Sequence, residues 1–269
     1  MRRPSLAPAF LRIPLAHRGL HDRSAGRPEN SLSAVRAAVA AGYGIEIDLQ
    51  LSGDGEAMVF HDATLPRVAR GRGYVSNRTA AELGRVALRY SRFGDMIPTL
   101  SEVLQAVSGQ VPLLIEIKDQ AGGGSGAGIG PLEAATARAL ADWDRPDDWV
   151  AVMSFNPESV AAMASAAPGV PRGLTTWAWP RARTLTLGAA RRDRLRAIAD
   201  YDSVGASFVS HEAGDLDRPR VNELRGRGAG ILCWTIRCAD TEDAVRKHAH
   251  NITFEGYKPA VPDQSFAAT

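Results

Sequence analysis

Short apolar runs alternate along the chain with longer segments in which apolar residues recur at helical spacing. The runs typical of buried strands are residues 13–17, 44–51, 56–61, 111–118, 149–155 and 230–236. The segments with helical spacing are residues 31–42, 99–108, 131–142, 157–166, 217–226 and 240–249. Because strands and helices alternate and the strands are apolar almost throughout, the pattern predicts a parallel sheet covered by helices. The length of 269 residues suits one α/β barrel.

Two stretches depart from this alternation. Residues 62–98 follow a predicted strand but carry only a weak helical pattern, and their glycines indicate turns, so we expect an insertion at the top of the barrel. Residues 121–130, with the sequence AGGGSGAGIG, read as a flexible loop, either a mobile active-site loop or a tolerated linker. Asn30 or Ser31 is expected to cap the first helix, which Gly42 ends.

Composition narrows the class of protein. The chain is 45% hydrophobic and 23% charged, as in ordinary globular domains, and its net charge of +2 gives no basis for nucleic-acid binding. Cys233 and Cys238 fit no zinc-site spacing and suit a reducing compartment. No secretory leader is recognisable, and no apolar run approaches the roughly 18 residues of a membrane span. We therefore expect a cytoplasmic protein without a membrane anchor; its oligomeric state stays open.

Two carboxylates alternate with isoleucines in the run GIEIDLQL at 44–51. Because side chains two residues apart on a strand share a face, Glu46 and Asp48 should point into the barrel mouth while Ile45 and Ile47 face the helices. Carboxylates this close repel each other and lose solvation, and a divalent cation is the usual remedy. Oxygen ligands suit Mg²⁺ or Ca²⁺. The alternative is that both are paired with Arg or Lys.

The run LLIEIK repeats this arrangement, with Glu116 and Lys118 on one face. Glu116 is a candidate third oxygen ligand, and Lys118 could balance surplus negative charge or hold a phosphate oxygen. A structural Glu–Lys pair would produce the same pattern. A Schiff-base lysine, as in aldolases, is a further alternative, although it requires a carboxylate-poor pocket that Glu116 opposes.

Two histidines end predicted strands, and a charged residue follows each. His17 precedes Arg18 and Gly19, and His61 precedes Asp62. Since imidazoles titrate near neutral pH, the pair could supply a general acid and a general base. Arg18 offers a planar fork for a phosphate group, and Gly19 would let the backbone turn close to a ligand.

These candidates share a position at the carboxyl ends of predicted parallel strands, where barrel enzymes carry their active sites. Structural charges scattered over a protein have no reason to gather at that end. The remaining histidines lack a comparable context: His21, His211, His248 and His250. The sequence thus predicts one site in the barrel mouth that combines a cation with acid–base groups.

With these residues in place, the chain resembles the glycerophosphodiester phosphodiesterase family. The matching segments are AHRG (16–19), 27–55, 59–83, IPTLSEVL (97–104) and LLIEIK (113–118), followed more weakly by SFNP (154–157) and CWTI (233–236). They cover nearly the whole chain in order. Two departures stand out. Ser31 occupies a position where the family usually has Thr, and Phe254 and Glu255 lie where it usually has Thr-Asp.

The resemblance implies a single (β/α)8 TIM barrel domain over residues 1–269, with a small insertion after the third strand at about 62–98. It implies metal-dependent hydrolysis of glycerophosphodiesters to glycerol 3-phosphate and an alcohol, with one divalent cation, Mg²⁺ or Ca²⁺. The implied roles are metal binding by Glu46, Asp48 and Glu116, acid–base catalysis by His17 and His61, and substrate or phosphate binding by Arg18, Lys118, Glu29, Asn30 and Trp234.

Two alternatives stay open at the level of sequence. One is a non-catalytic barrel that binds glycerol phosphates, although such a protein could dispense with both histidines. The other is a lipid-cleaving relative similar to phospholipase D, which needs an apolar rim; Trp177, Trp179 and residues 185–187 could form one or could belong to the core. The alcohol head group and the order in which the histidines act are not readable from the sequence.

Overall fold

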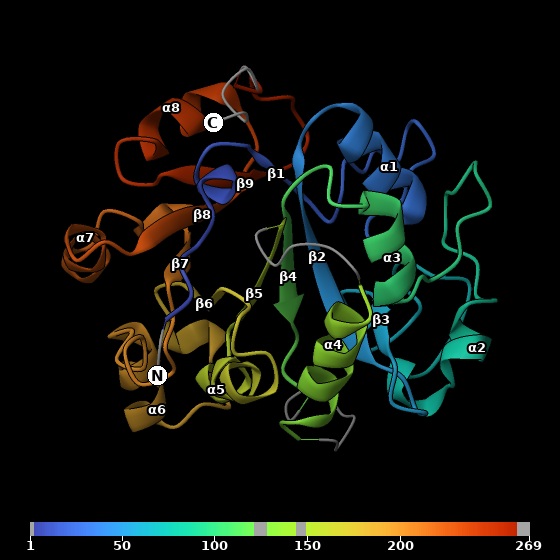
Figure 1. Cartoon of the computed structure of the whole chain (residues 1–269), viewed down its shortest axis with the longest axis horizontal. Helices are drawn as coiled ribbons and strands as arrows, with labels where there is room; N and C mark the ends of the chain where they lie inside the picture. The colour runs from blue at the N-terminus through green and yellow to red at the C-terminus, as the bar shows by residue number, and fades with distance from the viewer. Residues whose placement is uncertain (1–2, 121–127, 144–148, 263–269) are drawn as a thin grey trace.

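A closed barrel of parallel strands surrounded by helices forms the centre of the computed structural model, which describes residues 3–120, 128–143 and 149–262 (Figure 1). In order around the ring, the strands are β1 (Leu15–His17), β2 (Gly44–Leu51), β4 (Leu113–Ile117), β5 (Val150–Ser154), β6 (Arg172–Thr176), β7 (Phe208–Glu212), β8 (Gly230–Ile236) and β9 (Asn251–Phe254). Strand β1 pairs with both β2 and β9, which closes the ring, and all these pairs are parallel. The predicted (β/α)8 barrel is confirmed.

Helices cover the outside of the barrel between successive strands (Figure 1). They are α1 (Leu32–Ala40), α3 (Leu100–Val107), α4 (Pro131–Ala141), α5 (Pro157–Ala166), α6 (Ala189–Arg196), α7 (Pro219–Gly226) and α8 (Ala239–Val245). Ser31 is the residue that caps α1, because its hydroxyl accepts a hydrogen bond from the backbone N–H of Ala34. None of the helices within the described ranges combines the length and apolar character needed to cross a bilayer.

The strand alternation places side chains as expected. Ile45 and Ile47 belong to the main core between the barrel and its helices. A smaller core lies inside the barrel, where Leu15, Leu114 and Phe208 pack with Phe10 of the short 3-10 helix η1 (Pro8–Leu11). Because η1 packs at the amino ends of the strands, the opposite, carboxyl ends are left for the polar side chains.

One predicted barrel strand has a different position. Strand β3 (Ala57–Val59) pairs antiparallel with β2 and lies outside the ring. The prediction that His61 ends a parallel barrel strand was therefore wrong. The β2–β3 hairpin nevertheless returns His61 to the barrel mouth, because the backbone N–H of Phe60 donates to the Asp48 carbonyl at 2.9 Å.

The stretch after β3 carries its own small core. Residues 62–98 include the 3-10 helix η2 (Val75–Asn77) and the helix α2 (Ala80–Leu83), which lies at the edge of the molecule in Figure 1. Leu65, Leu83 and Ile97 pack there against Phe60. The Gly-rich stretch 121–130 falls mostly outside the described residues, so its predicted role stays open.

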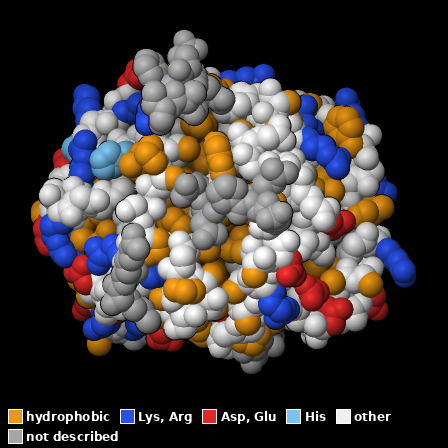
Figure 2. Space-filling view, viewed as in Figure 1, with side chains coloured by type: hydrophobic (Ala, Val, Ile, Leu, Met, Phe, Trp, Pro, Cys, Tyr) orange, Lys and Arg blue, Asp and Glu red, His pale blue; other side chains and the backbone are white. Residues whose placement is uncertain are grey.

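Charged side chains are mixed on the face drawn in Figure 2. Lys and Arg lie around its rim, interspersed with acidic and hydrophobic side chains. This distribution agrees with the near-neutral net charge of +2.

Candidate active site

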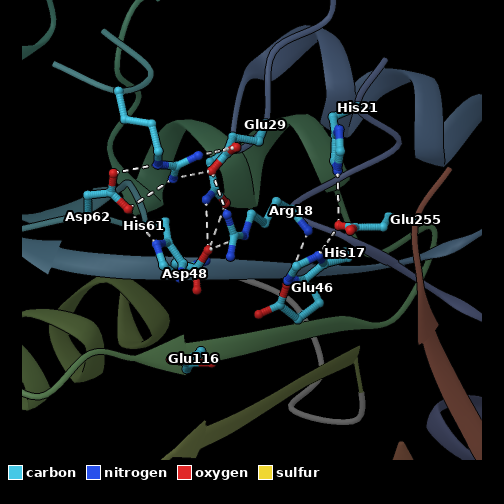
Figure 3. Close-up of polar contacts among 12 residues, drawn as sticks. His17, Arg18, His21, Glu29, Glu46, Asp48, His61, Asp62, Glu116 and Glu255 are labelled. Carbon is cyan, nitrogen blue, oxygen red and sulfur yellow. Dashed lines mark hydrogen bonds and ion pairs between the residues drawn. The ribbon is translucent and has the colours of Figure 1, made fainter. Parts of the chain in front are cut away.

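Three carboxylates meet at the carboxyl ends of β2 and β4. Glu46, Asp48 and Glu116 expose only 2%, 1% and 6% of their surface, and each offers an oxygen within 4.8 Å of the other two. Asp48 and Glu116 are register partners in the β2–β4 pair, which explains why the sequence brings them together. Figure 3 shows these side chains gathered on the two strands.

Burial and mutual repulsion raise the pKa of two of these acids. Desolvation, followed by the charges of Asp48 and Glu116, raises the pKa of Glu46 well above its usual value. Desolvation likewise raises the pKa of Glu116. Burial alone would raise the pKa of Asp48 too, but the nearby positive charges, that of Lys118 first and also that of Arg18, hold it well below its usual range. The raised values mean that burial and mutual repulsion oppose three negative charges at this place unless a further positive charge balances them.

Lys118 lies against this cluster. Its ammonium is 2.7 Å from Asp48 Oδ1 and also donates to Glu116. Although burial alone would lower it, the two carboxylates raise the pKa of Lys118. A permanently charged ammonium cannot attack a carbonyl, so the Schiff-base alternative is not supported. The same contacts form the Glu–Lys pair that the sequence analysis left open as an alternative, while the predicted phosphate contact of Lys118 stays a prediction.

His17 is held from both sides. Its Nδ1 lies 2.5 Å from Glu255 Oε2, and its Nε2 lies 4.0 Å from Glu46 Oε2. Because a carboxylate only accepts, Glu255 favours the tautomer with the proton on Nδ1 and leaves Nε2 facing the carboxylate cluster. His21 also points to Glu255, at 3.6 Å, so the expectation that His21 lacks a context was wrong (Figure 3).

His61 is held in a matching way. Its Nδ1 lies 2.6 Å from Asp62 Oδ1. Burial lowers the pKa of both His17 and His61, which favours neutral imidazoles. In each ring, Nδ1 therefore lies against a carboxylate, and that carboxylate makes no hydrogen bond with Nε2.

Arg67, in the stretch 62–98, links Asp62, the partner of His61, to Glu29. The Arg67 guanidinium makes two hydrogen bonds of 2.6 and 2.9 Å to Asp62 and two of 2.8 and 2.7 Å to Glu29. Glu29 also accepts from Arg18 at 2.7 Å. Bidentate pairs of this kind fix orientation as well as charge.

Two further residues, Asn30 and Gly19, make contacts that support the site. The Asn30 amide donates to Asp48 Oδ2 at 2.9 Å. Gly19 has φ +76°, and a Cβ there would lie 3.0 Å from Ala34, so the close approach made possible by this glycine is to α1. This packing accounts for the glycine, and the expectation that the backbone turns close to a ligand there stays a prediction.

The two imidazoles, the three carboxylates and two of the cationic groups surround one cavity of about 270 Å³. His17, His61, the three carboxylates, Arg18, Lys118 and Trp234 are among its lining residues. Thr175 and Thr253 line it as well, and their buried hydroxyls have no hydrogen-bond partner within the described part of the chain. Because buried polar groups are normally paired, these hydroxyls fit a site that receives a polar ligand.

The donor set fits a hard divalent cation. Three buried carboxylate oxygens on two neighbouring strands match the oxygen ligands that Mg²⁺ and Ca²⁺ take, and one ion would relieve the mutual repulsion of the three carboxylates. No aromatic or thiol group is among these ligand atoms.

The sequence analysis assigned no role to three of the groups that shape this site. Glu255 lies just after β9, a strand whose short run NITF had no clear apolar alternation. Arg67 lies in the irregular insertion, where spacing carries no information. Thr175 is the penultimate residue of β6, a strand that the sequence analysis did not predict.

Comparison with known proteins agrees with this geometry. The sequence profile of the glycerophosphoryl diester phosphodiesterase family matches residues 17–252. The chain belongs to this family. A glycerophosphodiester phosphodiesterase of Caldanaerobacter subterraneus is 33% identical over 167 residues, which cover 60% of this chain and 65% of that protein.

Solved structures share the fold of this family member. An Oleispira antarctica phosphodiesterase, solved in complex with the product sn-glycerol-3-phosphate, superposes with a TM-score of 0.72 at 24% identity, covering 90% of this chain and 93% of that one. A glycerophosphodiester phosphodiesterase from Thermotoga maritima gives a TM-score of 0.65 at 22% identity, covering 90% and 94%.

Proposed function

We propose that this protein, a glycerophosphodiester phosphodiesterase by family, hydrolyses its substrates with one divalent cation and two histidines. The observation that carries the proposal is the single cavity lined by Glu46, Asp48, Glu116, His17 and His61. Acid–base groups and a cation site are therefore within reach of one bound phosphate.

Glu46, Asp48 and Glu116 would hold the cation, Mg²⁺ or Ca²⁺. When bound, it would neutralise phosphate charge and act as a Lewis acid. Arg18 and Lys118 line the same cavity and would add positive charge where negative charge develops in the transition state. Glu29 and Asn30 hold Arg18 and Asp48 in place, and this contact pattern supports a positioning role for both.

His17 and His61 would divide the proton transfers. One imidazole, in its neutral form, takes up the proton of the attacking oxygen at Nε2, and the other, which enters as the imidazolium, donates its Nε2 proton to the departing alcohol oxygen. The contacts of Glu255 and Asp62 with the Nδ1 atoms leave both Nε2 atoms for this chemistry. The products would be glycerol 3-phosphate and an alcohol. The cytoplasmic location stays a prediction.

The direct test is release of glycerol 3-phosphate by the purified protein. The protein is first treated with a chelator and then assayed with glycerophosphoethanol, with and without added Mg²⁺ or Ca²⁺. We expect turnover only after a cation is added. Product release that persists in the chelator would contradict the metal requirement, and none under any condition would contradict hydrolysis of this substrate class.

A further inference from the structure

A second cavity adjoins the catalytic one. It has a volume of about 380 Å³, within the range of small-molecule sites. Phe155 and Trp234 line both cavities, so the two share a wall. Phe155 directly follows β5, and Trp177, another lining residue, directly follows β6. The second cavity therefore opens at the same carboxyl ends of the strands as the catalytic groups.

A continuous row of aromatic rings leads from one cavity into the other. The ring of Trp234 lies 5.5 Å from that of Phe155, which lies 6.0 Å from Trp179. Trp179 in turn lies 5.4 Å from Trp177. Leu187 and Leu195 complete the apolar part of the lining. A group that leaves the phosphate in this direction would meet hydrocarbon surface, where hydroxyl groups would lose their hydrogen bonds.

The charges around this cavity oppose a cationic ligand. The Arg183 guanidinium lies 4.6 Å from the Trp177 ring centre, so a cation already covers one face of the aromatic row. Arg191 also lines the cavity, against one carboxylate, Asp119, among its described lining residues. An aromatic site for a quaternary ammonium needs free ring faces and a surplus of negative charge. Here Arg183 takes one face of Trp177, and two guanidinium groups stand against one carboxylate among the described lining residues.

We propose that this cavity binds the alcohol side of the substrate and selects an uncharged apolar alcohol, alkyl or aryl, over a cationic one. This inference rests on the proposed hydrolysis of glycerophosphodiesters. The glycerol side, with its hydroxyls, belongs to the catalytic cavity, where Thr175, Thr253 and the charged groups offer polar partners. The apolar side then extends along the aromatic row.

Three soluble diesters test the inference: glycerophosphoethanol, glycerophosphohexanol and glycerophospho-6-aminohexanol. They share the glycerol and the phosphate and differ only in chain length and terminal charge. Burial of each added methylene is worth about fourfold, so we expect kcat/KM for the hexanol diester to exceed that of the ethanol diester by about tenfold or more. The terminal ammonium should remove most of this gain.

Variants of the lining residues test whether this cavity causes the preference for the hexanol diester. In Trp177→Ala, and in Leu187→Ser if the first does not fold, the ratio of the hexanol to the ethanol diester should fall toward one. Leu185→Ala is the matched control, because Leu185 is 79% exposed in the same loop and does not line the cavity; it should keep the wild-type ratio.

The failures are distinguishable. If the wild-type protein hydrolyses all three diesters with equal kcat/KM, or prefers the ammonium, the inference is overturned while the proposed hydrolysis stands. If none of the diesters releases glycerol 3-phosphate in the presence of Mg²⁺ or Ca²⁺, the proposed function itself is contradicted.

Discussion

Glu255 is a positioning residue in our account rather than a catalytic one. Its carboxylate binds His17 at 2.5 Å and is also contacted by His21 and Arg237, at 3.6 and 2.7 Å. Hydrogen bonds from His17 and then from His21 hold the pKa of Glu255 well below its usual range, so it stays a carboxylate. A charged acceptor on Nδ1 fixes both the tautomer and the ring orientation.

The Glu255→Ala variant should lower kcat on the order of tenfold or more and change KM little, because a misoriented imidazole affects the proton transfer and not substrate binding. Glu255→Gln keeps an acceptor oxygen and should recover part of the loss. Steady-state kinetics on one diester measure both. A normal kcat in Glu255→Ala would show that the contact is merely structural.

Removal of either imidazole should be more severe. We expect His17→Ala and His61→Ala each to lower kcat by about 10²–10⁴, the usual contribution of a general acid or base. Circular dichroism should show that both variants stay folded. His248→Ala is the control, since His248 is 32% exposed beside Asp217, away from the cavity, and should keep wild-type turnover. Near-normal kcat in either active-site variant would refute the assignment.

At the scale of elements, the start of α1 shows how a cap supports the site. The Ser31 hydroxyl donates to the Pro28 carbonyl at 2.7 Å and accepts from the Ala34 N–H at 3.1 Å. The preceding residue, Asn30, reaches Asp48, so the cap and the carboxylate cluster are linked through one short turn.

The Ser31→Ala variant should therefore lower the free energy of unfolding by about 1–2 kcal/mol, because a helix cap is lost in a fully buried position. Ser31→Thr retains the hydroxyl and should lose less. Denaturant unfolding curves give both values. Equal stability of the alanine variant and the wild-type protein would mean that the cap contributes nothing.

Strands in which apolar and polar residues alternate strictly were predictable, and buried strands with an irregular pattern of polar residues were not. Strand β2 shows isoleucines alternating with acids, and this pattern gave the correct face for Glu46 and Asp48. Strand β6 begins with the buried Arg172, whose guanidinium donates to the Val204 carbonyl at 3.3 Å. Its polar pattern gives no strand signal, because tertiary hydrogen bonds satisfy the charge-bearing group.

Two other elements were missed for related reasons. Strand β7 contains the buried His211, whose Nδ1 lies 2.6 Å from the Thr176 hydroxyl of the neighbouring strand. Helix α6, AARRDRLR, has one buried residue, Leu195, and so no apolar stripe to recognise. The antiparallel position of β3 was equally unreadable, since a short apolar run does not specify its pairing direction.

At the scale of the whole molecule, the carboxylate cluster lowers the stability of the protein when no cation is bound. Glu46, Asp48 and Glu116 are buried together within 4.8 Å, and Lys118 and Arg18 pair with Asp48 at 2.7 and 3.3 Å. Function and stability are therefore in opposition at this cluster.

Without a cation, Glu46→Gln should raise the free energy of unfolding by about 1 kcal/mol or more, because it removes a buried like charge while keeping the size of the side chain. With saturating Mg²⁺ or Ca²⁺ the order should reverse, since only the wild-type protein gains binding energy. Thermal unfolding with and without the cation measures this. A glutamine variant that is less stable in chelator would contradict the repulsion.

The central claim is that three carboxylates bind one catalytic cation. Isothermal titration calorimetry of the chelator-treated protein with Mg²⁺, and in a separate titration with Ca²⁺, tests it without any substrate. We predict one saturable site in the wild-type protein and its loss in Glu116→Gln. Absence of binding of either ion to the folded wild-type protein, or unchanged binding in the variant, would contradict the account.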